Sequence, residues 1–102
     1  MAIIRACSYT ATIEAPENPT GYSAILVTFQ QDGVNKIEKN KSSLTFENNN
    51  IIVKLDQVET KTFTCGKQVF MQIRCYKSQY NAPGSKIWAI NVCPALDDEV
   101  LS

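Results

Sequence analysis

The chain of 102 residues contains no histidine, and it has only four glycines and four prolines. Histidine is the commonest general base in enzymes and the commonest metal ligand, so its absence removes most catalytic arrangements. Without histidine, no cysteine has the usual activating base. The four cysteines have no C-x-x-C spacing, and no set of other ligands completes a zinc site: Cys7, Cys65, Cys75 and Cys93. We therefore expect a protein that is not an enzyme and that holds no cofactor and no metal.

Long apolar runs are also absent. No segment approaches the ~20 apolar residues that a membrane helix needs. The first residues, MAIIRACSYT, do not resemble a signal peptide, because the apolar run before Arg5 is only three residues long. These features predict synthesis in the cytoplasm, no membrane partner and reduced thiols, although the even number of cysteines leaves disulfide pairing open.

What the sequence does contain is alternation of apolar and polar residues. Residues 68–77 read QVFMQIRCYK, and period two over such a length is typical of a half-buried strand. The odd-numbered residues are apolar and are expected to face inward: Val69, Met71, Ile73 and Cys75. The even-numbered residues are more polar and are expected to face outward: Phe70, Gln72, Arg74 and Tyr76. Residues 7–13 repeat the pattern, which places Cys7 on an inward parity too. Cys93 is out of phase with its apolar neighbours, so we expect it to face solvent and to react first with a thiol reagent.

Further strands are predicted over residues 22–31, 34–39, 44–46, 51–55 and 86–93. Asp32-Gly33 between two alternating segments indicates a tight hairpin, and Val34 after it is expected to touch the core. Asp56 followed by Glu59 is typical of a helix capping box. The sequence thus predicts an all-β, Ig-like two-sheet antiparallel sandwich of about seven strands, with one short helical turn near residues 56–60. Residues 1–95 form this domain, and residues 96–102 form a tail.

The tail is acidic and ends in apolar residues. The net charge is zero, but without the acidic trio the other seven acids and ten bases leave +3. Such a tail can dock on a neighbouring molecule, remain solvated or, with poorly converging oxygens, bind a divalent cation. We favour association, through Asp97, Asp98, Glu99, Val100 and Leu101.

Three other groups of residues are candidates for binding a protein, a sugar or a nucleic acid. Arg74 and Tyr76, on the outward parity, can anchor a protein interface or simply face solvent. Trp88 shares parity with Ile90 and Val92, which favours a core position over a sugar-binding platform. A small basic cluster has no accompanying arginine or stacking aromatic residue, so we expect a solvated loop and no nucleic-acid partner: Lys36, Lys39 and Lys41.

Three motifs in the C-terminal half resemble those of a known group. Residues 52–63 resemble "V-x-L-[TD]-Q-x-E-T-x-x-F", residues 69–74 resemble "V-x-x-Q-[IV]-R", and residues 96–101 resemble "L-x-[DN]-E-V-[IL]". In this order they are similar to small proteins from the structural-gene regions of tailed bacteriophages and prophages. The resemblance implies a virion protein of the head, neck or tail, with other virion structural proteins as partners and self-association as a further option. Alternatives are a carbohydrate- or cell-surface-binding module and a soluble phage factor that inhibits a host protein.

Overall fold

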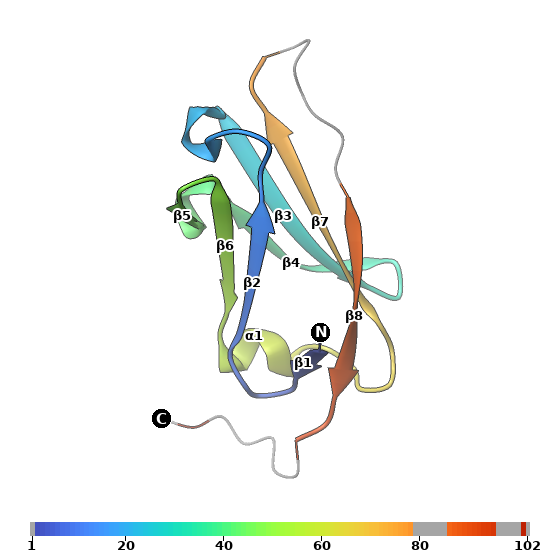
Figure 1. The fold of residues 1–102 in the computed structure, drawn as a ribbon. Coiled ribbons are helices and arrows are strands. Elements are labelled where there is room, and N and C mark those ends of the chain that lie inside the picture. Colours follow the sequence, from blue (N-terminus) through green and yellow to red (C-terminus); the bar gives the residue numbers. More distant parts are fainter. Residues whose placement is uncertain (1, 79–85, 96–100, 102) are drawn as a thin grey trace.

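A computed structural model describes residues 2–78, 86–95 and 101, and these residues form two packed β-sheets (Figure 1). Within them lie eight strands, two short 3-10 helices and one short α-helix. In chain order they are β1 (Ala2–Ile4), β2 (Tyr9–Glu14), η1 (Pro19–Gly21), β3 (Ala24–Gln31), β4 (Val34–Asn40), η2 (Lys41–Ser43), β5 (Thr45–Glu47), β6 (Asn50–Leu55), α1 (Gln57–Lys61), β7 (Val69–Tyr76) and β8 (Ile87–Cys93). The predicted all-β, two-sheet architecture is therefore confirmed.

The larger sheet has the strand order β1-β8-β7-β3-β4, and the smaller has the order β2-β6-β5. Every pairing is antiparallel except that of β1 with β8, which is parallel. A purely antiparallel sandwich was therefore a wrong expectation. Parallel strands cannot be joined by a tight hairpin, and β1 and β8 come from opposite ends of the chain. No local sequence signal marks the pair.

The core lies between the sheets and follows the predicted alternation. Val69, Met71 and Ile73 are buried, whereas Phe70 and Arg74 on the same strand are exposed. Phe29 of β3 packs against Phe63, which follows α1, with ring centroids 6.4 Å apart. Inward residues of both sheets, together with three residues of the connecting segments (Ala15, Tyr22 and Leu44), supply the rest: Ile3, Ala11, Ile13, Ile25, Val27, Ile37, Ile51, Val53, Leu55, Ile90 and Val92.

Two predicted core positions are wrong. Cys7 is exposed, because the chain turns between β1 and β2: its backbone N–H donates to the Ile4 carbonyl at 3.1 Å, and Ala6 has a φ of 60°. The alternation therefore begins only at Tyr9. Val34 is 57% exposed because it follows the hairpin directly and precedes a register shift between β3 and β4. Such a shift changes which side of the strand faces the core.

The predicted turns have the expected backbone. Asp32 and Gly33 both have positive φ, 55° and 74°, as a type I′ hairpin requires. At α1, the Asp56 carboxylate accepts from the Glu59 N–H at 2.8 Å, and the Glu59 carboxylate accepts from the Asp56 N–H at 3.1 Å. This is the predicted capping box. None of the helices in the described part of the chain is long and apolar enough to span a membrane.

The three lysines of the basic cluster lie on β4 and η2, and each makes a polar contact with a distant segment of the chain. Lys36 donates to the Thr62 carbonyl at 3.0 Å, and Lys39 pairs with Glu59 at 2.6 Å. Lys41 donates to two backbone carbonyls near η1, at 3.1 and 2.6 Å. The expectation of solvated side chains holds for Lys36, which stays exposed while bonded, and is wrong for Lys39 and Lys41, which are partly buried. The three contacts join β4 and η2 to the segments around α1 and η1.

Candidate functional site

Several large apolar side chains are exposed on the outer face of the five-stranded sheet. Phe70 is 42% exposed, Tyr76 46% and Ile87 57%. The outer face of the three-stranded sheet presents Thr10, Thr12, Glu14 and Lys54 instead. Clusters of exposed aromatic and aliphatic side chains are features of interaction surfaces. The two faces therefore differ in character, and the larger sheet offers the candidate binding surface.

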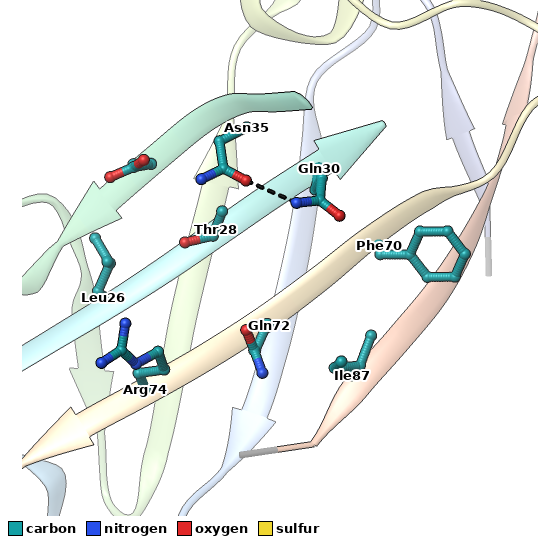
Figure 2. Close-up of a pocket in the computed structure, with 9 residues that line it drawn as sticks. Leu26, Thr28, Gln30, Asn35, Phe70, Gln72, Arg74 and Ile87 are labelled. Atoms are coloured by element: carbon teal, nitrogen blue, oxygen red, sulfur yellow. Dashed lines mark hydrogen bonds between the residues drawn. The ribbon is translucent and has the colours of Figure 1, made fainter. Parts of the chain in front are cut away.

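A shallow hollow of about 390 Å³ lies over this face, on β3, β4, β7 and β8. The strand register places Leu26 beside Arg74 and Gln72 beside Ile87 (Figure 2). On its far side the Gln30 amide donates to Asn35 at 2.9 Å. We call the following residues the outer-face patch: Leu26, Thr28, Gln30, Phe70, Gln72, Arg74 and Ile87.

Two charged residues line the hollow, Glu38 of β4 and Arg74 of β7. The Arg74 guanidinium is the cationic group of the outer-face patch. It forms no hydrogen bond or ion pair with another residue in the described part of the chain. Arginine and aromatic residues are enriched at the energetic centres of protein interfaces. Tyr76 lies two residues farther along β7 on the same exposed parity, beyond the hollow. The structure therefore brings both predicted residues to one face, with Arg74 in the hollow and Tyr76 beside it.

Three residues of the patch were missed by the sequence reading: Leu26, Phe70 and Ile87. Their outward parity was readable, but which strands lie side by side was not. An apolar side chain on an outward position is unremarkable alone, since folded proteins expose much apolar surface. Only the strand order β8-β7-β3 places the three around Arg74.

The predicted tail residues are mostly beyond what can be described. Asp97, Asp98, Glu99 and Val100 lie outside the described residues. Leu101 is described, and its backbone N–H and carbonyl pair with the Gln57 side-chain amide at 2.7 and 2.9 Å. Its side chain is 74% exposed. The contact is within the molecule, on α1, and leaves the association prediction untested.

A second, more apolar hollow of about 230 Å³ opens between the sheets near β2 and β8. Trp88 lines it and packs against the core while staying half-buried. The Lys86 ammonium lies 5.8 Å from the centre of the Trp88 ring, which is a cation–π arrangement. The packing against the core and this contact occupy part of the Trp88 ring surface. Burial also raises the pKa of the Cys75 thiol, another residue of this hollow.

The chemistry that the described residues can support is limited. They contain no cluster of three or more acidic residues and cysteines placed to hold a metal ion. All four cysteines have free thiols, with Cys7 and Cys93 exposed and Cys65 and Cys75 partly buried. The exposed position of Cys93 agrees with the sequence prediction.

Comparison with known proteins identifies the fold. No protein-family model matches the chain, and a comparison with curated proteins gives no match. Similar solved structures include two strand-swapped dimers of mouse leukocyte-associated immunoglobulin-like receptor 1. For its Ig-like domain the TM-score is 0.54 at 13% identity, over 91% of this chain and 86% of that one. For its extracellular domain the TM-score is 0.51 at 13% identity, over 90% and 85%. The chain therefore has an Ig-like β-sandwich fold, as predicted.

This sandwich lacks two features of antibody domains. Those domains have a disulfide between the sheets and a tryptophan on the third strand that packs against it. Here every cysteine is free, the single tryptophan is on β8, and Phe29 fills the core from β3. Apolar packing between the sheets, without a cross-link, therefore holds this Ig-like domain together.

Proposed function

We propose that this chain is a non-enzymatic binding domain that contacts a partner protein through the outer-face patch. The observation that carries the proposal is the grouping of Phe70, Ile87 and Arg74 around one hollow, on a sheet face that no other element of the described ranges covers. A partner that covers the hollow removes apolar surface from water, which stabilises the complex by about 25 cal/mol per Å². Arg74 then adds directional hydrogen bonds.

We further propose that the partner is a virion structural protein and that the chain is part of a phage particle. The support is the resemblance in the C-terminal half. Most of the residues that carry it have a role in the fold: Val53, Leu55 and Phe63 are buried, and Asp56 and Glu59 form the capping box. The resemblance therefore lies mainly in residues that stabilise the segment from β6 through α1. The contact surface itself is argued from the patch.

A second candidate function is self-association, in which copies of this chain bind one another. Its support is the zero net charge, which gives little repulsion between copies, and the strand-swapped dimers of the two similar receptor structures. Size-exclusion chromatography with light scattering over a range of concentrations tests it. A constant monomer mass would exclude it under those conditions.

The principal test purifies phage particles from cultures of the organism that encodes the chain and quantifies the chain in them by mass spectrometry. The wild-type protein should be present at a fixed copy number. Arg74→Glu should be lost from particles, and Phe70→Ala should be reduced. The matched control is Lys54→Glu, the same charge reversal at an exposed site on the other sheet.

The outcomes separate the parts of the proposal. If wild-type chain is absent from particles, the virion assignment is wrong. If it is present and Arg74→Glu is incorporated as well as Lys54→Glu, the contact lies elsewhere on the molecule. Circular dichroism of each purified variant establishes that the fold is intact.

A further inference from the structure

β2 is an edge strand that nothing in the described part of the chain protects. The strand order β2-β6-β5 leaves one side of Tyr9–Glu14 without a neighbour. The other edges of the two sheets are blunted. β1 and β5 have three residues each, and β4 carries lysines and a register shift. Short strands, lysines and bulges are the usual devices that stop edges from pairing, and β2 has none of them.

The hydrogen-bonding register shows which groups of β2 are free. The Ala15 N–H donates to the Asn49 carbonyl at 2.8 Å, so residues of odd number direct their backbone groups toward β6. The even-numbered residues between them therefore direct N–H and C=O away from the sheet: Thr10, Thr12 and Glu14. An added strand would complete the ladder at these positions.

The apolar hollow of about 230 Å³ lies beside this open edge. It is lined from β2 by Ile13 and Glu14, from β6 by Ile51, and from the facing sheet by Ile73 and Trp88. A strand placed next to β2 would have one side of its chain directed toward this hollow and the other side directed to solvent, because side chains alternate. The edge supplies backbone pairing and the hollow supplies a place for an apolar side chain.

We propose that β2 and this hollow form an acceptor site for one extended segment of another polypeptide, with apolar residues alternating with polar ones. The site is separate from the outer-face patch. A basic residue on the outward side of the segment would lie opposite Glu14, which is exposed at the end of the strand. Opposite charges across neighbouring strands stabilise pairing, and like charges oppose it.

A second copy of the domain does not suit the site, for a steric reason. The inner side of an added strand would face β8, since Trp88 shares the hollow with Ile13. The inner side of β2 in another copy is already covered by that copy's own five-stranded sheet, as the burial of Ala11 and Ile13 shows. The five-stranded sheets of the two copies would then have to occupy the same space beneath the paired β2 strands. A lone strand has no such cover.

The test uses a synthetic peptide with the sequence Lys-Val-Thr-Ile-Thr-Val-Lys, whose ends place a lysine near Glu14 in either strand direction. Trp88 is the single tryptophan of the chain and lines the hollow, so its fluorescence reports occupancy directly. The wild-type domain should show a saturable change. A peptide N-methylated on alternate residues, which removes the donors facing β2, should give none, and replacing both lysines by glutamate should weaken binding.

The matched protein variants are Thr12→Pro and Thr12→Val. Proline removes an N–H that points away from β6, so the existing ladder remains and edge strands tolerate it. Thr12→Pro should bind the peptide about tenfold more weakly, because one acceptor of the added strand loses its donor. Thr12→Val keeps the N–H and should bind like the wild type.

Several results would overturn the proposal. They are no saturable change with the wild-type domain, equal binding by the N-methylated peptide, and unweakened binding by a Thr12→Pro variant with native circular dichroism. Self-association of the wild type that Thr12→Pro abolishes would assign the edge to a second copy and contradict the choice of a lone strand. If Thr12→Pro does not fold, the N-methylated peptide decides.

Discussion

Gln31 is the buried polar side chain whose removal should cost this domain most. It ends β3 with no exposed surface. Its Nε2 donates to the Thr64 carbonyl at 2.9 Å and to the Lys67 carbonyl at 3.2 Å. Its Oε1 accepts from the Thr64 N–H at 2.8 Å. One amide therefore satisfies three backbone groups of the loop between α1 and β7 and fixes that loop to the core.

The perturbation is Gln31→Met, which keeps the length of the side chain and removes its polar atoms. An intramolecular hydrogen bond contributes about 1 kcal/mol net, and a buried backbone group left without a partner costs about 1–3 kcal/mol. Because the three loop groups are only partly buried, water relieves some of this, and we expect a loss of about 2–3 kcal/mol. In urea unfolding, the midpoint should fall by about 1–2 M with an unchanged slope.

The control is Gln30→Met, at the neighbouring residue, whose single side-chain bond to Asn35 is at the surface. This change should cost about 0.5 kcal/mol or less, as exposed substitutions do. A loss below about 1 kcal/mol for Gln31→Met would refute the reasoning, because the loop would then be held by its apolar contacts alone. A changed slope would point instead to a change in the unfolded state.

Two further predictions concern Tyr9 and the thiols. The Tyr9 hydroxyl is buried without a partner among the described residues, and burial raises its pKa. Tyr9→Phe should therefore leave stability unchanged or raise it by up to about 1 kcal/mol in thermal or urea unfolding, and a clear loss would reveal a missed partner. A thiol reagent near neutral pH should label exposed Cys7 and Cys93 before Cys75, whose raised pKa lowers its thiolate fraction until the pH is increased. Faster labelling of Cys75, followed by peptide mass spectrometry, would contradict this order.

Much of the fold could be predicted because its signals are local. The alternation at Val69–Tyr76 predicted the correct buried side, and Asp32-Gly33 predicted the hairpin. The capping box depends on two residues three apart, so it was also readable. Each of these signals depends on backbone preferences within a few residues, which act in the same way in any surrounding fold.

What could not be predicted depends on contacts between distant residues. β1 is three residues long and finds its partner β8 almost ninety positions away, as in the pair Ala2 and Asn91. Gln31 looked like an ordinary strand end, because its stabilising hydrogen bonds are made to a loop more than thirty residues later in the chain. Lys39 and Lys41 looked solvated for the same reason. Tertiary contacts determine the burial and the bonding partners of such residues, and local sequence patterns do not predict these contacts.

The two proposed surfaces lie on opposite sides of the five-stranded sheet, and this arrangement has a consequence for how the domain can act. The outer-face patch is on the solvent side of β3, β7 and β8, whereas the strand acceptor is at the edge of β2 and opens toward the interior. A partner on one leaves the other uncovered. The lysine contacts join β4 and η2 to the segments around α1 and η1, which follow the strands β6 and β2 of the smaller sheet. If one assembly contacts the outer-face patch and also supplies a strand to β2, each contact raises the effective concentration for the other. The two contacts then reinforce each other although they do not touch. Combining Arg74→Glu with Thr12→Pro should therefore reduce particle incorporation by more than the product of the two single losses if both contacts are made to the same assembly.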